Sequence, residues 1–394
     1  GEYLSEDTEI ANLTARNGYG EYGAGICADY SDLIISNCIV TGNRAAVPQG
    51  EAAGISLFMG SPVIKNSMIV SNIIAGGGAG GGVYLWGCSN GRLYDSVVAW
   101  NSATGYSGDA GGVMIWGGEG SVERCIIMGN HAQNDGGGMN IWGGNYLVQD
   151  TIICSNYNDM GLGCAGSFYS SPSAEFRNCL FIGNTAGYRD AGWGSILFDG
   201  QAKFINCTFA GNTAVTPRSG TFFLEGSGSV QFHNTIMWNK DIPEIYVNWG
   251  SAPAVQYSDV DGGYTGTGNI NSDPLFWVDG YHLKNSNSPC FNAGVVISGV
   301  EGSDIDGESR IYVSLPDLGV DEFTDSDSDN MPDWWEIRYF GDLDETASGD
   351  FDCDGLPNGW EYQYGLNPAS GLLPGLVGWW KLEEESGTNV LDSS

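Results

Sequence analysis

Short apolar runs bounded by small and polar residues recur along the first 240 residues, and each run ends at an asparagine. Typical segments are SNCIVTGN, KNSMIVSN, YDSVVAWN and ERCIIMGN, and the anchoring residues are Asn17, Asn43, Asn72, Asn101, Asn130, Asn156, Asn184, Asn212 and Asn239. Successive anchors lie 26–29 residues apart. Because these runs show no helical period, they predict strands, and the regular spacing predicts one coil of a solenoid per repeat.

A second apolar segment precedes the anchors by 14–16 residues, as in AGISLF, GGVYLW, GGVMIW and GGMNIW. Each coil therefore contains at least two strands, and we expect about nine to eleven coils. Glycine-rich stretches between the strands suit sharp corners, since glycine adopts positive φ at no steric cost. Asparagine also tolerates the left-handed region, so we expect the anchors to occupy corners and to stack as a structural ladder.

Strand alternation predicts which side chains face the core. Inward positions are Cys38, Cys125, Cys179, Cys207, Val40, Ile127, Phe181 and Phe209. The intervening positions form an outward apolar row of Ile39, Met68, Val97, Ile126, Ile152 and Leu180.

In the second strand, Val83 and Leu85 are predicted to point inward, and Tyr84 and Trp86 outward. The matching positions give an aromatic stripe of Phe58, Trp86, Trp116, Trp142 and Phe198. Two interpretations remain open. Exposed aromatic rings could stack on sugars or on a neighbouring protomer, whereas a shift of one residue would turn both outward rows into core.

The repeat resembles the right-handed parallel β-helix of bacterial secreted proteins over about residues 8–322. The segments DPLFW, YHLKNSNSPCFNAG, DIDGESR and PDLGVDEF are similar to the C-terminal end shared by many such surface proteins. The resemblance implies an all-β domain over 1–322 and an extracellular, cell-surface location.

Two twelve-residue loops follow, DSDSDNMPDWWE (325–336) and DFDCDGLPNGWE (350–361). Side chains at positions 1, 3, 5, 9 and 12 and the backbone carbonyl at position 7 supply the oxygen ligands that Ca²⁺ prefers. The predicted ligands are Asp325, Asp327, Asp329, Met331, Asp333 and Glu336 in the first loop, and Asp350, Asp352, Asp354, Leu356, Asn358 and Glu361 in the second. Position 6 is Gly355 in the second loop and Asn330 in the first, where asparagine also tolerates the left-handed region.

A solvated acidic linker would explain the charge of this region but not two identical spacings. The region resembles the thrombospondin type-3-like calcium repeats of bacterial surface proteins, which implies a small EF-hand-like module over 323–370 that Ca²⁺ stiffens. Residues 371–394 look like the first strands of a laminin-G/concanavalin-like domain. We expect either a truncated domain there or a strand exchanged with a neighbour.

The chain has 14 Lys and Arg against 48 Asp and Glu, a net charge of −34. Such a charge disfavours nucleic acid as a partner, since phosphate binding needs clustered cations. No apolar stretch is long enough to span a bilayer. Of ten cysteines none forms a CxxC pair. Cys179 and Cys207 occupy equivalent slots of successive coils, and we favour free core thiols there over a disulfide.

The β-helix resemblance raises the prospect of a polysaccharide lyase or hydrolase. Catalytic candidates are sparse, however: Asp95 and Asp150 share a column two coils apart with Arg124 between them, and three scattered histidines predict no Ser-His-Asp triad. We therefore expect a secreted, non-catalytic, fibre-forming or cell-surface structural protein that associates with itself or with other surface proteins. A protein that binds or degrades polysaccharide is the alternative.

Overall fold

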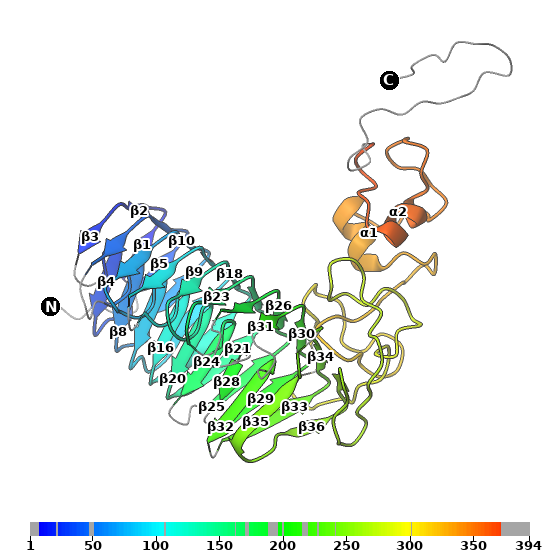
Figure 1. Cartoon of the computed structure of the whole chain (residues 1–394). Coiled ribbons are helices and arrows are strands. Elements are labelled where there is room, and N and C mark those ends of the chain that lie inside the picture. Colours follow the sequence, from blue (N-terminus) through cyan, green and yellow to red (C-terminus); the bar gives the residue numbers. More distant parts are fainter. Residues whose placement is uncertain are drawn as a thin grey trace, which may run out of the picture. The chain divides into compact units, whose positions relative to one another are not determined.

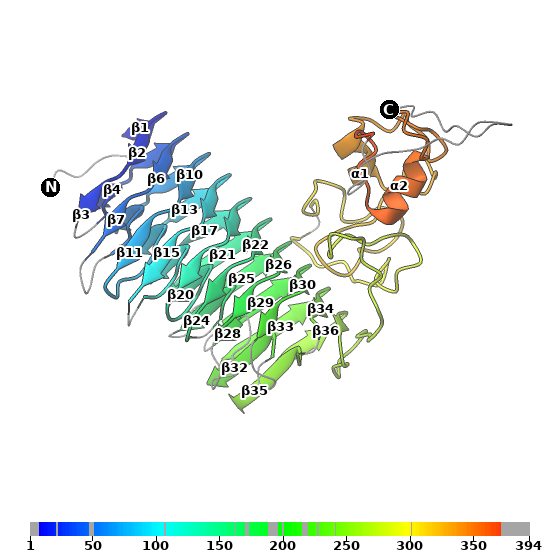
Figure 2. The ribbon, with the colours of Figure 1, turned by 45° about the horizontal axis from the view of Figure 1, so that its top comes forward.

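The computed structural model describes residues 8–20, 23–46, 51–105, 108–161, 163–169, 173–187, 196–198, 201–214, 220–226, 228–240, 242–300 and 302–371. The chain divides into two compact units, 1–322 and 323–394. The first unit is a parallel β-solenoid, in which short strands of successive coils stack side by side (Figure 1). Figure 2 shows the stacked strands along the coils. The all-β parallel solenoid predicted from the repeat is confirmed.

Four parallel sheets run along the solenoid, and in the described residues each of the first eight coils contributes strands to them in the order A, B, C, D. Sheet A contains β1 (Glu9–Ala11), β5 (Ile34–Ser36), β9 (Val63–Lys65), β13 (Gly91–Tyr94), β17 (Glu119–Glu123), β21 (Asn145–Gln149), β25 (Ser173–Arg177), β29 (Gln201–Ile205), β33 (Ser229–His233) and β36 (Ala254–Gln256). Sheet B contains β2 (Thr14–Arg16), β6 (Ile39–Thr41), β10 (Met68–Val70), β14 (Val97–Ala99), β18 (Ile126–Met128), β22 (Ile152–Cys154), β26 (Leu180–Ile182), β30 (Thr208–Ala210), β34 (Ile236–Trp238) and β37 (Asp259–Val260).

The other two sheets complete the coils. Sheet C contains β3 (Tyr19–Gly20), β7 (Arg44–Ala45), β11 (Ile73–Ala75), β15 (Ser102–Thr104), β19 (His131–Ala132), β23 (Tyr157–Asn158), β27 (Thr185–Ala186) and β31 (Thr213–Ala214). Sheet D contains β4 (Ile26–Asp29), β8 (Ile55–Phe58), β12 (Val83–Trp86), β16 (Val113–Trp116), β20 (Met139–Trp142), β24 (Gly166–Tyr169), β28 (Ile196–Phe198), β32 (Phe222–Gly226) and β35 (Ile245–Gly250).

The core fills the inside of the coils, as the alternation predicts. All the residues predicted to point inward in the anchor strands are buried in one continuous cluster. Stacked rings such as Phe181 and Phe209, whose centroids lie 4.3 Å apart, repeat along the core because equivalent positions are in register. Cys179 and Cys207 are buried and free, as favoured from the sequence.

The anchoring asparagines form the predicted ladder. In a representative rung, the Asn101 side-chain amide donates to Asn130 Oδ1 at 3.1 Å and to the Ile69 carbonyl at 2.8 Å. Its Oδ1 accepts the backbone and side-chain N–H groups of Asn72, both at 2.9 Å. The predicted backbone conformation is wrong for most anchors. For every anchor except Asn17 and Asn239, the positive φ falls on the residue before the anchor, because the anchor side chain must turn inward to reach its neighbours. These residues are Gly42, Ser71, Trp100, Gly129, Ser155, Gly183 and Gly211.

The outward apolar row of sheet B is exposed only in part. Ile39, Met68 and Ile126 are exposed, and Val97 and Ile152 are half-buried. The prediction for Leu180 is wrong, because this side chain is fully buried. The irregular segment 261–322, here called the closing segment, lies against this part of sheet B: Val320 N–H donates to Oγ1 of Thr208, the neighbour of Leu180 in the column, at 2.9 Å.

Tyr84 is also buried, contrary to the expected exposure. It lies on the outer face of sheet D, as the alternation predicts, but packs there with Ala52, Ala110 and Met114. The segments that precede the strands of sheet D fold back over this face and pair with one another through parallel bridges. They therefore cover the first outward position of β8, β12 and β16, where Ser56, Tyr84 and Met114 are buried, and leave the second position of β12, that of Trp86, exposed.

The second unit contains two short helices, α1 (Asp333–Tyr339) and α2 (Asn358–Tyr364). Each begins directly after a proline, whose fixed φ suits a helix start. Trp335 of α1 is buried and packs edge-on against Tyr362 of α2, with ring centroids 5.3 Å apart. Among the described residues of both units, no helix is long and apolar enough to cross a membrane.

Candidate functional site

The two acidic loops have the same internal hydrogen bonds, position for position. In each, the position 1 carboxylate accepts the N–H groups of positions 5 and 6, position 3 that of position 5, and position 5 that of position 7, at 2.8–3.3 Å. These residues are Asp325, Asp327, Asp329, Asn330 and Met331 in the first loop, and Asp350, Asp352, Asp354, Gly355 and Leu356 in the second. The three aspartates of each loop offer oxygens within 4.8 Å of one another, a spacing that could hold a metal ion.

Position 6 has a left-handed backbone in both loops. Its φ is 76° at Asn330 and 94° at Gly355. Asparagine thus makes the turn that glycine makes in the second loop, as expected from its tolerance of this region.

The position 9 side chains close the loops. Asp333 Oδ1 accepts the N–H of Ser326 at 2.8 Å, and Asn358 Oδ1 accepts the N–H of Phe351 at 3.0 Å. These oxygens therefore fasten the second residue of each loop to the first turn of the following helix. Their predicted role as direct ligands stays a prediction.

The position 12 glutamates are buried, and at least one carboxylate oxygen of each has no donor among the described residues. Both side-chain oxygens of Glu336 and Oε2 of Glu361 lack a hydrogen-bond partner among the described residues. Burial, followed by the charges of the neighbouring aspartates, raises the pKa of Glu336 to about 8 and that of Glu361 to about 7. A buried carboxylate without a donor is unfavourable unless a cation or a proton neutralises it. The donor set of both loops therefore fits a hard divalent cation.

The aromatic stripe on sheet D is present in part. Trp86 and Trp116 are about 40% exposed, at 42% and 40%, and Phe58 and Trp142 are half-buried. Trp116 and Trp142 stack with centroids 4.6 Å apart and planes 17° apart. The register of sheet D moves Phe198 out of the stripe, because Phe198 pairs with the core residue Phe168. The side chain of Phe198 lies outside the described residues.

The position after Trp142 in the stripe belongs to Tyr169. Sequence reasoning missed it because its strand, GSFY, lacks the apolar pattern of its neighbours. At the other end, Tyr30, Phe58 and Trp86 line a surface cavity of about 480 Å³ together with the carboxylates of Asp29 and Glu51. The structure thus places aromatic faces and acids side by side there.

A Ser-His-Asp constellation that the sequence did not predict lies on sheet C. Ser102 Oγ is 3.2 Å from His131 Nδ1, and His131 Nε2 is 3.0 Å from Asp159 Oδ2. Only the three-dimensional register reveals it, because the residues come from three successive coils. The strand N–H groups of Ser102 and His131 donate to carbonyls of the previous coil at 2.9 Å and are not free to stabilise an oxyanion.

The charged column considered for catalysis is joined by an ion pair. Arg124 Nε lies 2.6 Å from Asp95 Oδ1, and Asp150 accepts a hydrogen bond from the Asn178 amide at 3.0 Å. These contacts connect successive coils. They give no support to a pair of carboxylates placed for glycoside hydrolysis.

Comparison of the chain with protein-family models, with curated proteins and with solved structures finds no match in any of the three.

Proposed function

We propose that this chain is a secreted, non-catalytic extracellular structural protein, in which a parallel β-solenoid is the rigid body and the loops at 325–336 and 350–361 bind Ca²⁺. The observation that carries the proposal is the pair of loops with matching hydrogen bonds, each ending in a buried glutamate with at least one oxygen that lacks a donor among the described residues. Loops of this kind are useful where Ca²⁺ is abundant, as it is outside cells.

Three aspartates, the position 7 carbonyl and the position 12 glutamate would hold the ion in each loop. Bound Ca²⁺ supplies two positive charges, which would neutralise the carboxylate cluster and tie the loop to the helix that carries the glutamate. The expected result is a stiffer C-terminal module. A solenoid with continuous sheets and a continuous asparagine ladder suits a structural role, since each coil is held by its neighbours.

Calorimetric titration of the full chain with Ca²⁺ tests the loops. The double variant Glu336→Gln and Glu361→Gln should lose two binding sites, because each substitution removes the only buried charged ligand of its loop. Asp344→Asn, an exposed aspartate outside the twelve-residue loops, is the control and should keep both sites. Unchanged stoichiometry in the double variant would refute calcium binding by the loops.

Electron microscopy of the native protein with and without a chelator tests the structural role. Ordered filaments that fray on chelation are expected. Short single rods in both conditions would contradict the fibre-forming role, whatever the titration shows.

The alternative function, polysaccharide binding, is favoured by a different observation. The stacked pair Trp116 and Trp142, with Trp86 beside it and a cavity lined by aromatic and acidic side chains, presents flat apolar faces to solvent. Such faces stack on sugar rings, and the nearby carboxylates favour neutral or cationic sugars over uronates. A glycan-array signal that Trp116→Ala abolishes would support polysaccharide binding by the stripe. An equal signal in the variant would rule it out.

A further inference from the structure

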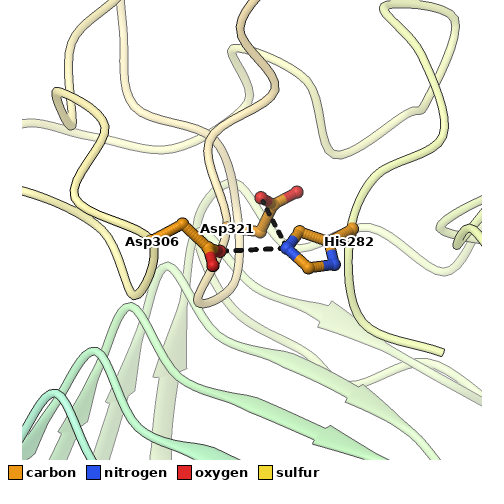
Figure 3. A group of neighbouring side chains, drawn as sticks. All are labelled: His282, Asp306 and Asp321. Carbon is orange, nitrogen blue, oxygen red and sulfur yellow. Dashed lines mark hydrogen bonds and ion pairs between the residues drawn. The ribbon is translucent and has the colours of Figure 1, made fainter. Parts of the chain in front are cut away.

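Five carboxylates and one imidazole gather in the closing segment, apart from the two loops and in the other compact unit. The residues are Asp279, His282, Asp304, Asp306, Glu308 and Asp321. They come from three stretches of chain, which Figure 3 represents by His282, Asp306 and Asp321. Residues 303–307 lie beside the coils that carry Arg124 and Asp150.

The imidazole of His282 is fully engaged by its neighbours. Its Nδ1 lies 2.5 Å from Asp279 Oδ2 and its Nε2 lies 2.9 Å from Asp306 Oδ2. Burial opposes a charge on this ring, but the carboxylates of Asp321, Asp279 and Asp306 together raise the pKa of His282 to about 10. His282 is therefore held between Asp279 and Asp306.

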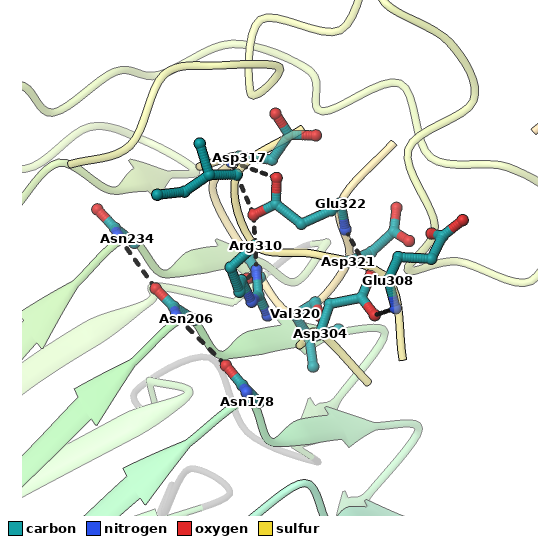
Figure 4. Close-up of polar contacts among 12 residues, drawn as sticks. Asn178, Asn206, Asn234, Asp304, Glu308, Arg310, Asp317, Val320, Asp321 and Glu322 are labelled. Carbon is teal, nitrogen blue, oxygen red and sulfur yellow. Dashed lines mark hydrogen bonds and ion pairs between the residues drawn. The ribbon is translucent and has the colours of Figure 1, made fainter. Parts of the chain in front are cut away.

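Three of the carboxylates form a separate group. Asp304, Glu308 and Asp321 each offer an oxygen within 4.8 Å of the other two. The Asp304 carboxylate is oriented by backbone N–H groups of its own loop and of Glu322, at 2.8–3.0 Å (Figure 4).

The decisive atom is Oδ1 of Asp321. Asp321 is 1% exposed and its Oδ2 accepts the N–H of Leu283 at 2.7 Å, whereas its Oδ1 has no hydrogen-bond partner among the described residues. His282 Nε2 lies 4.0 Å from Asp321 Oδ1 and is shared with Asp306. A buried carboxylate oxygen left in this way is unfavourable unless a ligand completes it.

The one arginine of this region does not complete the group. The Arg310 guanidinium donates to the Glu322 carboxylate at 3.1 Å and to the carbonyls of Gly319 and Val320 at 2.9 and 2.6 Å (Figure 4). Its hydrogen bonds are thus directed to Glu322 and the backbone.

We propose that Asp304, Glu308 and Asp321 bind a divalent cation of the Ca²⁺ class. All three ligands are carboxylate oxygens, which hard cations prefer, and the ion would replace the missing partner of the buried Asp321 oxygen. This site is independent of the loops at 325–361. Its ligands come from two stretches of the closing segment rather than from one twelve-residue loop.

Cation binding at this position would fasten the closing segment to the solenoid. The stretch around Asp304 contacts the coils through the Ser303 carbonyl, which accepts the Asn178 amide at 2.8 Å. The stretch around Asp321 contacts them through Val320 N–H, which donates to Thr208. An ion that joins both stretches therefore stabilises the cover over the buried part of sheet B.

Calcium titration of the full chain in the Glu336→Gln and Glu361→Gln background separates this site from the loops. With about 1 mM Mg²⁺ present, this background should retain one Ca²⁺ site. Adding Asp321→Asn should weaken that site about tenfold or more, whereas Asp273→Asn, which removes an exposed charge of the closing segment and keeps the oxygen that caps Leu275, should leave it unchanged.

Thermal unfolding shows whether the Asp321→Asn variant is correctly folded. Without Ca²⁺, Asp321→Asn should be at least as stable as its parent, because it removes a buried carboxylate oxygen that lacks a hydrogen-bond donor among the described residues, and added Ca²⁺ should no longer raise its Tm. No binding in the loop-silenced background, or binding that Asp321→Asn does not weaken, would overturn the proposal. So would a preference for Zn²⁺ that His282→Gln abolishes. Failure of the loops alone would leave this site intact, since Asp321→Asn in the unmodified chain would still remove one Ca²⁺.

Discussion

The asparagine ladder and the acidic cluster of the closing segment are both buried polar regions of the same unit, but they satisfy their polar atoms differently. Each amide of the ladder donates to one neighbour and accepts from the other, so the hydrogen bonds continue from coil to coil. The last rung ends on Glu244, whose carboxylate accepts the backbone and side-chain N–H groups of Asn239. In the cluster, three carboxylates contact one imidazole, and one buried carboxylate oxygen, Oδ1 of Asp321, has no hydrogen-bond donor among the described residues.

The difference follows from the chemistry of the side chains. An amide both donates and accepts, so a column of asparagines is complete without any other molecule. An ionised carboxylate only accepts, so a cluster of carboxylates needs protons or cations from outside. Glu244 belongs at the end of the ladder for the same reason, since the last amide needs an acceptor and nothing beyond it needs a donor.

The largest effect is expected from breaking the ladder in its middle. Asn130→Ala removes an amide that makes four hydrogen bonds, to the Val98 carbonyl, to Asn156 and, as acceptor, to two N–H groups of Asn101. The orphaned buried partners should lower the free energy of unfolding by about 3–5 kcal/mol. Urea denaturation measures this change.

Asn90→Ala is the matched control for the ladder, because Asn90 is exposed and should cost less than about 0.5 kcal/mol. Equal losses of stability in the two variants would mean that the side-chain hydrogen bonds of the ladder do not stabilise the fold.

An intermediate effect on stability is expected from the ionisation of Glu244, the carboxylate at the end of the ladder. Burial raises the pKa of Glu244 to about 7, although hydrogen bonds from Asn239 oppose the shift. Between its ordinary pKa near 4.5 and about 7 the folded protein binds the proton and the unfolded chain does not. Stability from this group is therefore complete below pH 4.5 and is lost as the pH rises through 7, by about 3 kcal/mol.

Unfolding measured from pH 5 to 8 in a chelator tests this sign. Glu244→Gln should be less stable than the parent at low pH, because one of its two acceptors becomes a donor, but its stability should fall less steeply with pH. Parallel pH profiles for the two proteins would show that Glu244 does not titrate in this range.

The sequence predicts the ladder and the fold well, but not the acidic cluster. The anchors recur at a nearly constant spacing, and strand alternation alone places Cys179 and Phe181 in the core. Alternation fails for Leu180 and Tyr84, because it says which face a side chain occupies and not what covers that face. The cover comes from irregular backbone, whose contacts with the coils, such as Asn178 to Ser303, span 125 residues.

The two kinds of cation site differ in the same way. A loop such as 325–336 carries its ligands at fixed spacing within twelve residues, so a local pattern reveals it. Asp304, Glu308 and Asp321 carry no such pattern, and His282 lies further away in the sequence. The closing segment must fold before these side chains meet.

The smallest effect on stability is expected at Ser102, His131 and Asp159, which belong neither to the asparagine ladder nor to the acidic cluster. The three are half-buried, and His131 also stacks on Tyr157 with centroids 4.1 Å apart. Since water can replace a lost partner at partly exposed positions, His131→Asn should change the free energy of unfolding by less than about 1 kcal/mol. A buried polar role like that of the ladder would cost several times more.

The same three residues test the non-catalytic function. An activated serine would react with a fluorophosphonate probe, and the reaction would depend on His131. We expect no labelling of Ser102 in the native protein, because the neighbouring strand N–H groups are already bonded to the previous coil and cannot stabilise the developing oxyanion. Labelling of Ser102 that His131→Asn abolishes would mean that Ser102 is an activated nucleophile. The proposed non-catalytic function would then be wrong.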